Sequence, residues 1–342
     1  MSKTWKKWMA LSLSILLALS MFSACGGNNA ADATQPQAAE DPEEAKALKV
    51  LTLGHSLAVD CGHMLNLVAQ AEGFEKELVI GTLYYSGCNL WQHVDFLTND
   101  SRDYKLYLSS TATPNTPPTI MENVTMREAL QHDYWDIIVM QGGVYEISQE
   151  ATYTDGKIQT IQDYVNQHKT NPNAVFAWHN AWAPPTDPDL MSMYNHEPHV
   201  YEQWYEKFNS DRSAWYQAMM TCVEQHILTD SSFVSYIPSG TAMENALSSY
   251  LGEKDLHRDY AHASDLGRVI VAYTWYCTLA GVDQLEEIKL DAIPVNFFRT
   301  TSDAVDRALT DAEKAVILES VNNALAKPTE MTQSQYTEAP AN

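Results

Sequence analysis

Short apolar runs alternate along the chain with segments whose apolar residues recur at helical spacing, from about residue 48 to residue 325. The apolar runs are rich in β-branched side chains, and they predict strands at 49–53, 78–84, 136–140, 174–178 and 233–237. The helical segments that follow them lie at about 59–72, 90–97, 157–168, 201–227 and 264–280. This alternation predicts an α/β fold, with a parallel central sheet between two helical layers in a three-layer α/β/α sandwich.

One segment interrupts the alternation. The stretch at 181–208 is rich in Pro, Trp and Tyr and too irregular for a strand or a regular helix. It therefore predicts an insertion over one face of the domain. The sequence leaves open whether this insertion is a lid over a binding site.

The N-terminal residues are typical of an export signal. Lys3, Lys6 and Lys7 precede an apolar stretch that ends in small residues. The sequence Phe22-Ser23-Ala24-Cys25 resembles the lipobox of bacterial lipoproteins, which implies that Cys25 is lipidated and tethers the protein to the outer face of the cytoplasmic membrane. An ordinary signal peptide cut near the same point is the alternative, and it would also export the protein.

These features divide the chain into four predicted parts. The residues after Cys25 are polar and lack apolar periodicity, as expected of a disordered spacer. The last residues are rich in Thr, Gln, Pro and Ala and are also expected to be disordered. The predicted parts are a signal peptide at 1–24, a lipidated Cys and linker at 25–46, a folded domain at 47–326 and a tail at 327–342.

Charge restricts the partners. The chain has 21 basic and 44 acidic residues, which gives a formal net charge of −23. Such acidity disfavours binding to nucleic acid and electrostatic docking on an anionic membrane. We therefore expect no nucleic-acid partner, and membrane contact through the lipid anchor only.

No cofactor or metal is expected. Cys61, Cys88, Cys222 and Cys277 show no CxxC spacing, so a zinc site is not indicated. These cysteines are interpreted as buried thiols, although pairing in an exported protein stays open. The His196-Glu197-Pro198-His199 cluster contains a proline that breaks the helix on which such ligands would need to lie.

Polar residues and glycines lie at the ends of three predicted strands, and a further pair precedes the last long helix, in an order that suggests one site. In a parallel sheet, ligands bind at the carboxyl ends of the strands. Ser56 follows the first strand and Gly87 the second, and Gln141 ends the third. Asp259 and His262 lie three residues apart before the last long helix, a spacing that can hold a carboxylate against one imidazole nitrogen.

These residues resemble the four sequence blocks of the SGNH (GDSL-type) hydrolase superfamily. Gly54-His55-Ser56-Leu57 is similar to the nucleophile block, with His55 where Asp or Asn is usual. Gly87 stands for the second-block glycine, Gln141 replaces the third-block asparagine, and Asp259-Tyr260-Ala261-His262 matches the fourth-block DxxH. The resemblance implies an α/β/α fold and ester hydrolysis, commonly of acetyl groups on carbohydrate. More narrowly, the chain resembles a largely uncharacterised bacterial branch of this superfamily.

The resemblance assigns roles that agree with elementary chemistry. Ser56 would be the nucleophile, His262 the base and Asp259 the residue that orients it. The backbone N–H groups of Ser56 and Gly87 and the Gln141 amide would form the oxyanion hole. His55 has no assigned role.

The Trp178-His179-Asn180-Ala181-Trp182 segment follows the fourth strand and so lies near the expected site. The aromatic faces of Trp178 and Trp182, with His179, could contact a sugar ring; burial in the core is the alternative. The leading interpretation is an extracytoplasmic serine esterase acting on acetyl or other short-chain esters of carbohydrate. A lipoprotein that binds a glycan or other ligand without turnover and a hydrolase of lipids or thioesters are the alternatives.

Overall fold

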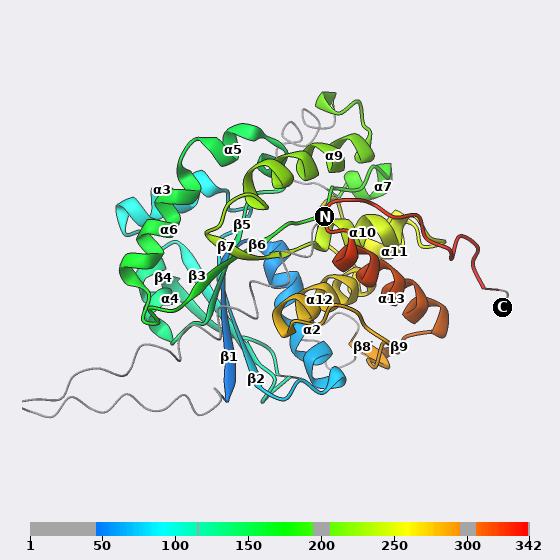
Figure 1. Ribbon diagram of the computed structural model, residues 1–342, viewed down its shortest axis with the longest axis horizontal. Coiled ribbons are helices and arrows are strands. Elements are labelled where there is room, and N and C mark those ends of the chain that lie inside the picture. The colour runs from blue at the N-terminus through cyan, green and yellow to red at the C-terminus, as the bar shows by residue number, and fades with distance from the viewer. Residues whose placement is uncertain (1–45, 115, 194–205, 295–305, 341–342) are drawn as a thin grey trace, which may run out of the picture. The chain divides into compact units, whose positions relative to one another are not determined.

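A seven-stranded sheet, in the order β4-β3-β2-β1-β5-β6-β7, organises the computed structural model (Figure 1). The structure describes residues 46–114, 116–193, 206–294 and 306–340. The strands are β1 (Ala47–Gly54), β2 (Glu77–Tyr84), β3 (Tyr104–Ser110), β4 (Thr119–Val124), β5 (Ile137–Gln141), β6 (Val175–His179) and β7 (Phe233–Ile237). Five of them run parallel, whereas β3 and β4 form an antiparallel edge on β2.

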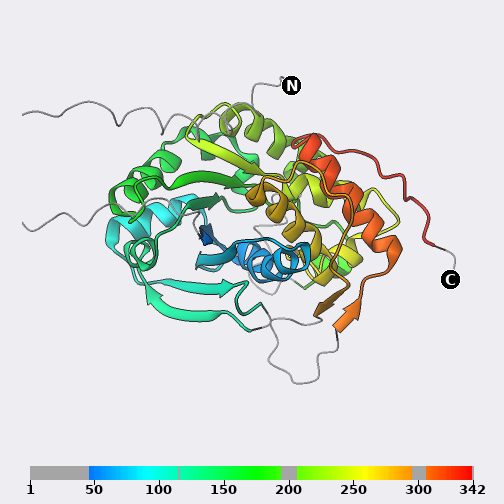
Figure 2. The ribbon, with the colours of Figure 1, turned by 60° about the horizontal axis from the view of Figure 1, so that its bottom comes forward.

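Helices cover both faces of the sheet (Figures 1 and 2). One layer contains α3 (Leu90–Asn99), α4 (Met126–His132) and α6 (Lys157–His168), which pack on one another. The other contains α2 (Ser56–Glu72) and α12 (Asp265–Ala280), with α13 (Asp311–Ala326) against α12. The predicted three-layer α/β/α architecture is therefore confirmed, with a sheet that is mostly rather than wholly parallel.

Shorter elements complete the described part of the chain. They are α5 (Glu150–Thr154), α7 (Pro188–Met191), α9 (Arg212–Cys222), α10 (Ser239–Leu247), α11 (Glu253–Leu256), the 3₁₀ helix η1 (Glu146–Ser148) and the π-helical turn η2 (Val223–Ile227). A separate ribbon pairs β8 (Ala292–Pro294) with β9 (Asp306–Ala308).

The five predicted strands are all present. The elements that the sequence analysis missed include strands β3 and β4 and the largely buried helix α10. Strand β4 has five exposed residues in six, so it lacks the apolar pattern on which strand prediction depends. The register between β3 and β4 also shifts, between Tyr104 and Leu106. The helix expected at 201–227 is observed only as α9 and η2, and 201–205 lie outside the described residues.

The core is formed by apolar side chains of both layers against the sheet. Cys61, Cys88, Cys222 and Cys277 are buried and free, in agreement with their interpretation as thiols. Within the described ranges no helix is long and apolar enough to cross a membrane. The predicted signal, Cys25 and most of the linker (1–45), and residues 194–205 of the predicted insertion, lie outside the described residues.

The C-terminal tail differs from the expectation of disorder. Thr241 Oγ1 donates a hydrogen bond of 2.6 Å to the carbonyl of Pro328, and Tyr250 N–H donates one of 2.8 Å to the carbonyl of Tyr336. Thr332 N–H donates to the side-chain oxygen of Asn245 at 2.7 Å. The polar composition of the tail does not indicate that it is ordered. Hydrogen bonds to α10 and to the residues after it hold the tail, and no apolar stripe marks it in the sequence.

Truncation after Ala326 is expected to lower the free energy of unfolding by about 1–3 kcal/mol, since several hydrogen bonds of about 1 kcal/mol each are removed. Truncation after Glu338 is the matched control, because it keeps the bond to Tyr336. Urea unfolding of both proteins checks this. Equal stability of the two truncated proteins would support a disordered tail instead.

Candidate active site

The carboxyl ends of β1 and β2 bring two loops together at one edge of the sheet. Gly54 pairs with Tyr84 in the parallel register, and Tyr85 N–H donates to the Gly54 carbonyl at 3.4 Å. Ser56 begins α2 directly after this point, so its N–H is one of the first-turn donors that have no acceptor within the helix. The partial positive charge of the helix N-terminus is therefore placed beside the Ser56 hydroxyl.

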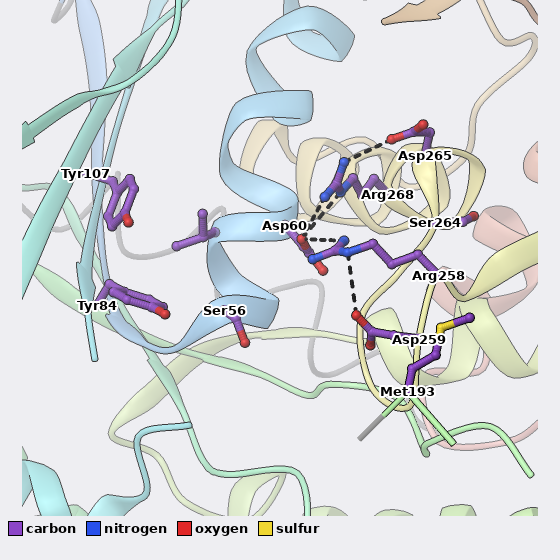
Figure 3. Close-up of a pocket in the computed structure, with 11 residues that line it drawn as sticks. Ser56, Asp60, Tyr84, Tyr107, Met193, Arg258, Asp259, Ser264, Asp265 and Arg268 are labelled. Atoms are coloured by element: carbon purple, nitrogen blue, oxygen red, sulfur yellow. Dashed lines mark hydrogen bonds and ion pairs between the residues drawn. The ribbon is translucent and has the colours of Figure 1, made fainter. Parts of the chain in front are cut away.

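Ser56, His262 and Asp259 form a hydrogen-bonded chain. His262 Nε2 lies 2.8 Å from Ser56 Oγ, and His262 Nδ1 lies 2.9 Å from both carboxylate oxygens of Asp259. Sequence analysis grouped these three residues, and the structure brings them together. Figure 3 shows Ser56 and Asp259 facing the same space.

The electrostatics define which imidazole nitrogen carries the proton. Burial alone would raise the pKa of Asp259, but the hydrogen bonds from the His262 side chain and from the N–H groups of His262 and Ala261 lower it to about 2. Asp259 is therefore an anion at neutral pH and must accept a proton from Nδ1. Nε2 is left to accept the proton of the Ser56 hydroxyl.

The loop that carries Asp259 and His262 is supported on two sides. The buried Trp182 indole donates a 2.8 Å hydrogen bond to the Ala261 carbonyl. Gly267 of α12 lets the helix approach the loop, because a Cβ there would lie 2.3 Å from the Leu256 carbonyl oxygen. Both contacts fix the loop that positions the imidazole.

His55 caps α2. Its Nδ1 accepts from Leu57 N–H at 3.4 Å, and its Nε2 lies 3.2 Å from the Gly142 carbonyl, so the neutral tautomer with a proton on Nε2 satisfies both contacts. Burial lowers the pKa of His55 to about 4, although the hydrogen bond to Gly142 raises it. His55 thus takes the capping position that Asp or Asn commonly fills.

Gln141 is not placed as an oxyanion donor, which corrects the sequence-based assignment. The side chain is fully buried, and its Nε2 lies 2.8 Å from His179 Nδ1. Its Oε1 accepts from His55 N–H at 3.4 Å, and that donor requires an oxygen. A Cβ on Gly54 would lie 2.7 Å from this Oε1, so Gln141 packs beneath the turn before Ser56. It supports the turn rather than facing the cavity.

Gly87 lies in the tight turn that follows β2. Its φ of +61° is in the region that favours glycine, and Cys88 N–H donates to the Tyr85 carbonyl at 3.2 Å across the turn. The β1–β2 register sets this turn next to the one before Ser56. The Gly87 N–H remains the candidate second donor for an oxyanion.

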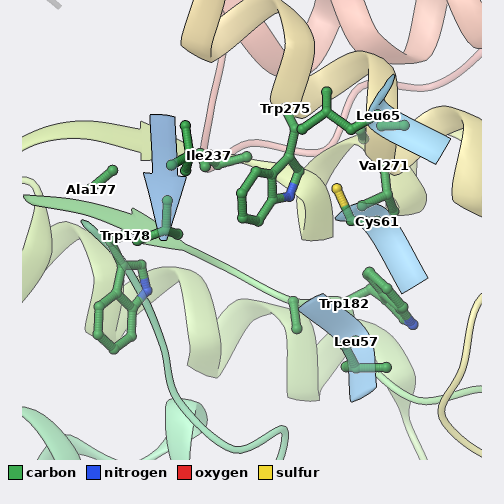
Figure 4. Close-up of a cluster of buried hydrophobic side chains, with 14 of the residues drawn as sticks. Leu57, Cys61, Leu65, Ala177, Trp178, Trp182, Ile237, Val271 and Trp275 are labelled. Carbon is green, nitrogen blue, oxygen red and sulfur yellow. The ribbon is translucent and has the colours of Figure 1, made fainter. Parts of the chain in front are cut away.

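The expected sugar contact of Trp178, His179 and Trp182 is also wrong. All three are at most 1% exposed, so none offers a free face to a ligand. Trp178 and Trp182 lie in the buried apolar cluster (Figure 4). Trp178 packs against Phe233, and Trp182 supports the His262 loop. The alternative reading of these residues as core is the correct one.

A cavity of about 620 Å³ opens beside Ser56 and contains residues that sequence analysis missed. Asp60 is buried on α2, and its Oδ1 accepts hydrogen bonds from Arg258 (2.9 Å) and Arg268 (3.1 Å). Tyr84 and Tyr107 form part of the wall. Asp60 lies four residues after Ser56 on the same helix face, which was the available sequence signal.

The described residues contain no group of three or more His, Cys, Asp or Glu side chains suited to holding a metal ion. The His196–His199 cluster lies outside them. What the described residues present at the site is a partly buried, hydrogen-bonded Ser–His–Asp arrangement beside a polar cavity.

The fold and the site together define the class of protein. It is an α/β sandwich with a Ser–His–Asp arrangement at the carboxyl ends of its strands. The chain belongs to the DUF4886 family, a domain of unknown function, whose family model matches residues 49–304. No curated protein matches the sequence.

Two solved structures are similar to this chain. The crystal structure of a DUF4886 family protein from Bacteroides uniformis has a TM-score of 0.67 and 21% identity, and the match covers 85% of this chain and 100% of that one. This likeness shows the shared fold alone. A protein from Slackia heliotrinireducens, described provisionally as an SGNH hydrolase, has a TM-score of 0.43 and 15% identity over 68% of this chain and 99% of that one. The second likeness is too distant to bear on fold or function.

The buried His55 is expected to make the fold acid-sensitive. Its pKa of about 4 in the folded protein lies below the ordinary 6.5, so the unfolded chain binds the proton first and stability is lost as the pH falls from 6.5 to 4. The contribution of this one group is about 3 kcal/mol at pH 4. His55→Asn keeps a capping side chain and should reduce the difference in unfolding free energy between pH 7 and pH 4 by roughly this amount.

Urea unfolding at the two pH values measures the effect. Gln131→Asn provides the control, since this exposed residue does not titrate and its replacement should leave the difference between the two pH values unchanged. An unchanged pH dependence in His55→Asn would show that His55 is not held neutral in the fold.

Proposed function

We propose that this protein is a serine esterase in which Ser56, His262 and Asp259 act as a catalytic triad. The observation that carries the proposal is the 2.8 Å contact between His262 Nε2 and Ser56 Oγ, with Asp259 on the opposite side of the same ring. The cavity beside Ser56 supports it, because a substrate can reach the hydroxyl there.

The reaction follows from the arrangement. Ser56 Oγ attacks the ester carbonyl carbon while His262 Nε2 takes the hydroxyl proton. Asp259 stabilises the resulting imidazolium, and the N–H groups of Ser56 and Gly87 stabilise the oxyanion. His262 then returns the proton to the departing alcohol, and water releases the acyl group from Ser56 by the same two steps.

The finer assignment is an extracytoplasmic enzyme acting on acetyl or other short-chain esters of carbohydrate. The resemblance to the SGNH blocks supports the ester chemistry, and the export signal with Cys25 supports a lipid-anchored position at the bacterial cell surface. The charged lining of the cavity favours a polar alcohol over a long acyl chain.

Binding without turnover is the second candidate. One observation favours it: Gln141 is turned away from the cavity, which leaves two backbone N–H groups as the proposed oxyanion donors. One such donor is worth about 3–4 kcal/mol of barrier, so a site that lacks the third would be a weaker catalyst.

Ser56→Ala is expected to abolish the hydrolysis of p-nitrophenyl acetate, butyrate and octanoate, because no other nucleophile lies against His262 Nε2 in the described site. Wild-type protein should favour the acetate. Initial rates and a matched circular dichroism spectrum check the variant. Retained turnover in a folded Ser56→Ala protein would rule out the triad, and a folded wild type with no turnover would favour binding.

Asp259→Asn is expected to lower kcat by about 10³-fold or more, because an amide does not hold the imidazole in the required tautomer. Its KM should change little, since Asp259 acts through His262. Steady-state kinetics on p-nitrophenyl acetate separate the two constants. A variant with near-wild-type kcat would show that His262 works without this carboxylate.

A further inference from the structure

The cavity beside Ser56 has two chemically different walls. Tyr84 and Tyr107 lie on neighbouring strands, with ring centroids 5.4 Å apart and an interplanar angle of 81°. Asp60 and Arg258 lie across from them, and Ser56 lies between the two walls (Figure 3). At about 620 Å³ the cavity falls within the range of about 300–1,000 Å³ that is usual for small-molecule sites.

Two groups of the polar wall have hydrogen-bonding capacity that no described residue satisfies. Arg258 Nη1 donates to Asp60 Oδ1 at 2.9 Å and to the Ala263 carbonyl at 2.7 Å, while Nη2 makes no hydrogen bond to the residues that the structure describes. Asp60 Oδ2 is buried and has no partner among the same residues. A buried carboxylate oxygen without a donor is costly, so it favours a ligand that brings one.

The charges around the cavity disfavour an anion. Three carboxylates (Asp60, Asp259 and Asp265) face two guanidinium groups (Arg258 and Arg268), which leaves one negative charge in excess. A carboxylate ligand would meet repulsion, and a long hydrocarbon chain would desolvate charged groups without pairing them. A neutral ring with neighbouring hydroxyls satisfies both the donor and the acceptor, and it can lay its C–H face on the tyrosines.

The cavity is lined in part by the loop that carries the proposed general acid. Arg258 and Asp259 belong to the same loop as His262, whose Nε2 must protonate that alcohol in the proposed reaction. We propose that this cavity binds the alcohol half of the ester as a polyhydroxylated ring, with Tyr107 and Tyr84 against its face and Arg258 and Asp60 reading two neighbouring hydroxyls. This inference rests on the proposed esterase function for its orientation.

Three classes of acetate ester separate ring packing from hydroxyl recognition. They are monoacetylated methyl glycosides (of glucose, galactose and xylose), cyclohexyl acetate, which has the ring without the hydroxyls, and ethyl acetate, which has neither. Wild-type kcat/KM, measured by acetate release, should be at least about tenfold higher for the best glycoside than for cyclohexyl acetate. Equal or reversed preference would overturn the inference.

Two variants test whether the preference for the glycoside arises in the cavity. Tyr107→Ala should lower kcat/KM for the glycoside by about tenfold and leave ethyl acetate within about twofold, because only the ring loses its platform. Arg258→Lys keeps the charge beside Asp60 but removes the second guanidinium nitrogen, so it should reduce the preference for the glycoside over cyclohexyl acetate. Tyr134→Ala is the matched control. This exposed tyrosine precedes β5 at the amino ends of the parallel strands, whereas Ser56 follows the carboxyl end of β1.

A binding measurement distinguishes the proposed esterase function from the proposed ring-binding subsite. Saturation-transfer NMR of the methyl glycosides with Ser56→Ala protein should detect binding that Tyr107→Ala, added to Ser56→Ala, abolishes. Binding without hydrolysis of any ester would refute the esterase and retain the subsite. Ser56-dependent hydrolysis of ethyl acetate, with no glycoside binding and no glycoside preference, would refute the subsite and retain the esterase.

Discussion

The hydrogen bond between His262 Nε2 and Ser56 Oγ is the contact on which the site depends, since it joins residues 206 positions apart. The end of β1 and the start of α2 position Ser56. His262 lies on a loop that is held in place by Trp182 on one side and by α12 on the other. The two supports come from different parts of the sequence. A site assembled in this way is rigid only when the whole sheet and the α2–α12 layer are formed.

The polar groups at the site are held in place before any ligand arrives. The triad, the capped start of α2 and the Asp60–Arg258–Arg268 cluster share one small volume at the strand ends. Groups held in this manner do not have to reorient as charge develops, which is the main electrostatic advantage of a folded site over water. The capped start of α2 requires His55 to be buried in its neutral form. The contact that orders this part of the site is therefore also the cause of the expected acid sensitivity of the fold.

Sequence reasoning succeeded where the signal is local. The parallel strands follow from apolar runs. The grouping of Ser56 with Asp259 and His262 follows from the end of the first strand, the DxxH spacing and the order of these motifs along the chain. It failed for Gln141 and Trp182. Whether a side chain near the end of a strand faces the cavity or is buried depends on elements that lie far along the chain. The pairing of Asp60 with Arg258, across 198 positions, has no local signal, although the spacing from Ser56 to Asp60 pointed to a shared helix face.

Strand β4 ends the sheet with an exposed edge, and exposed edges invite pairing with another chain. Here the register against β3 shifts, and Asn123 adopts a left-handed conformation with φ of +56°. Glu122 on β4, which pairs with Lys105 of the neighbouring β3, adds charge beside this edge. An incoming strand would therefore find neither a straight row of donors and acceptors nor an uncharged surface, so the irregularity of β4 disfavours edge-to-edge pairing with another copy of the chain.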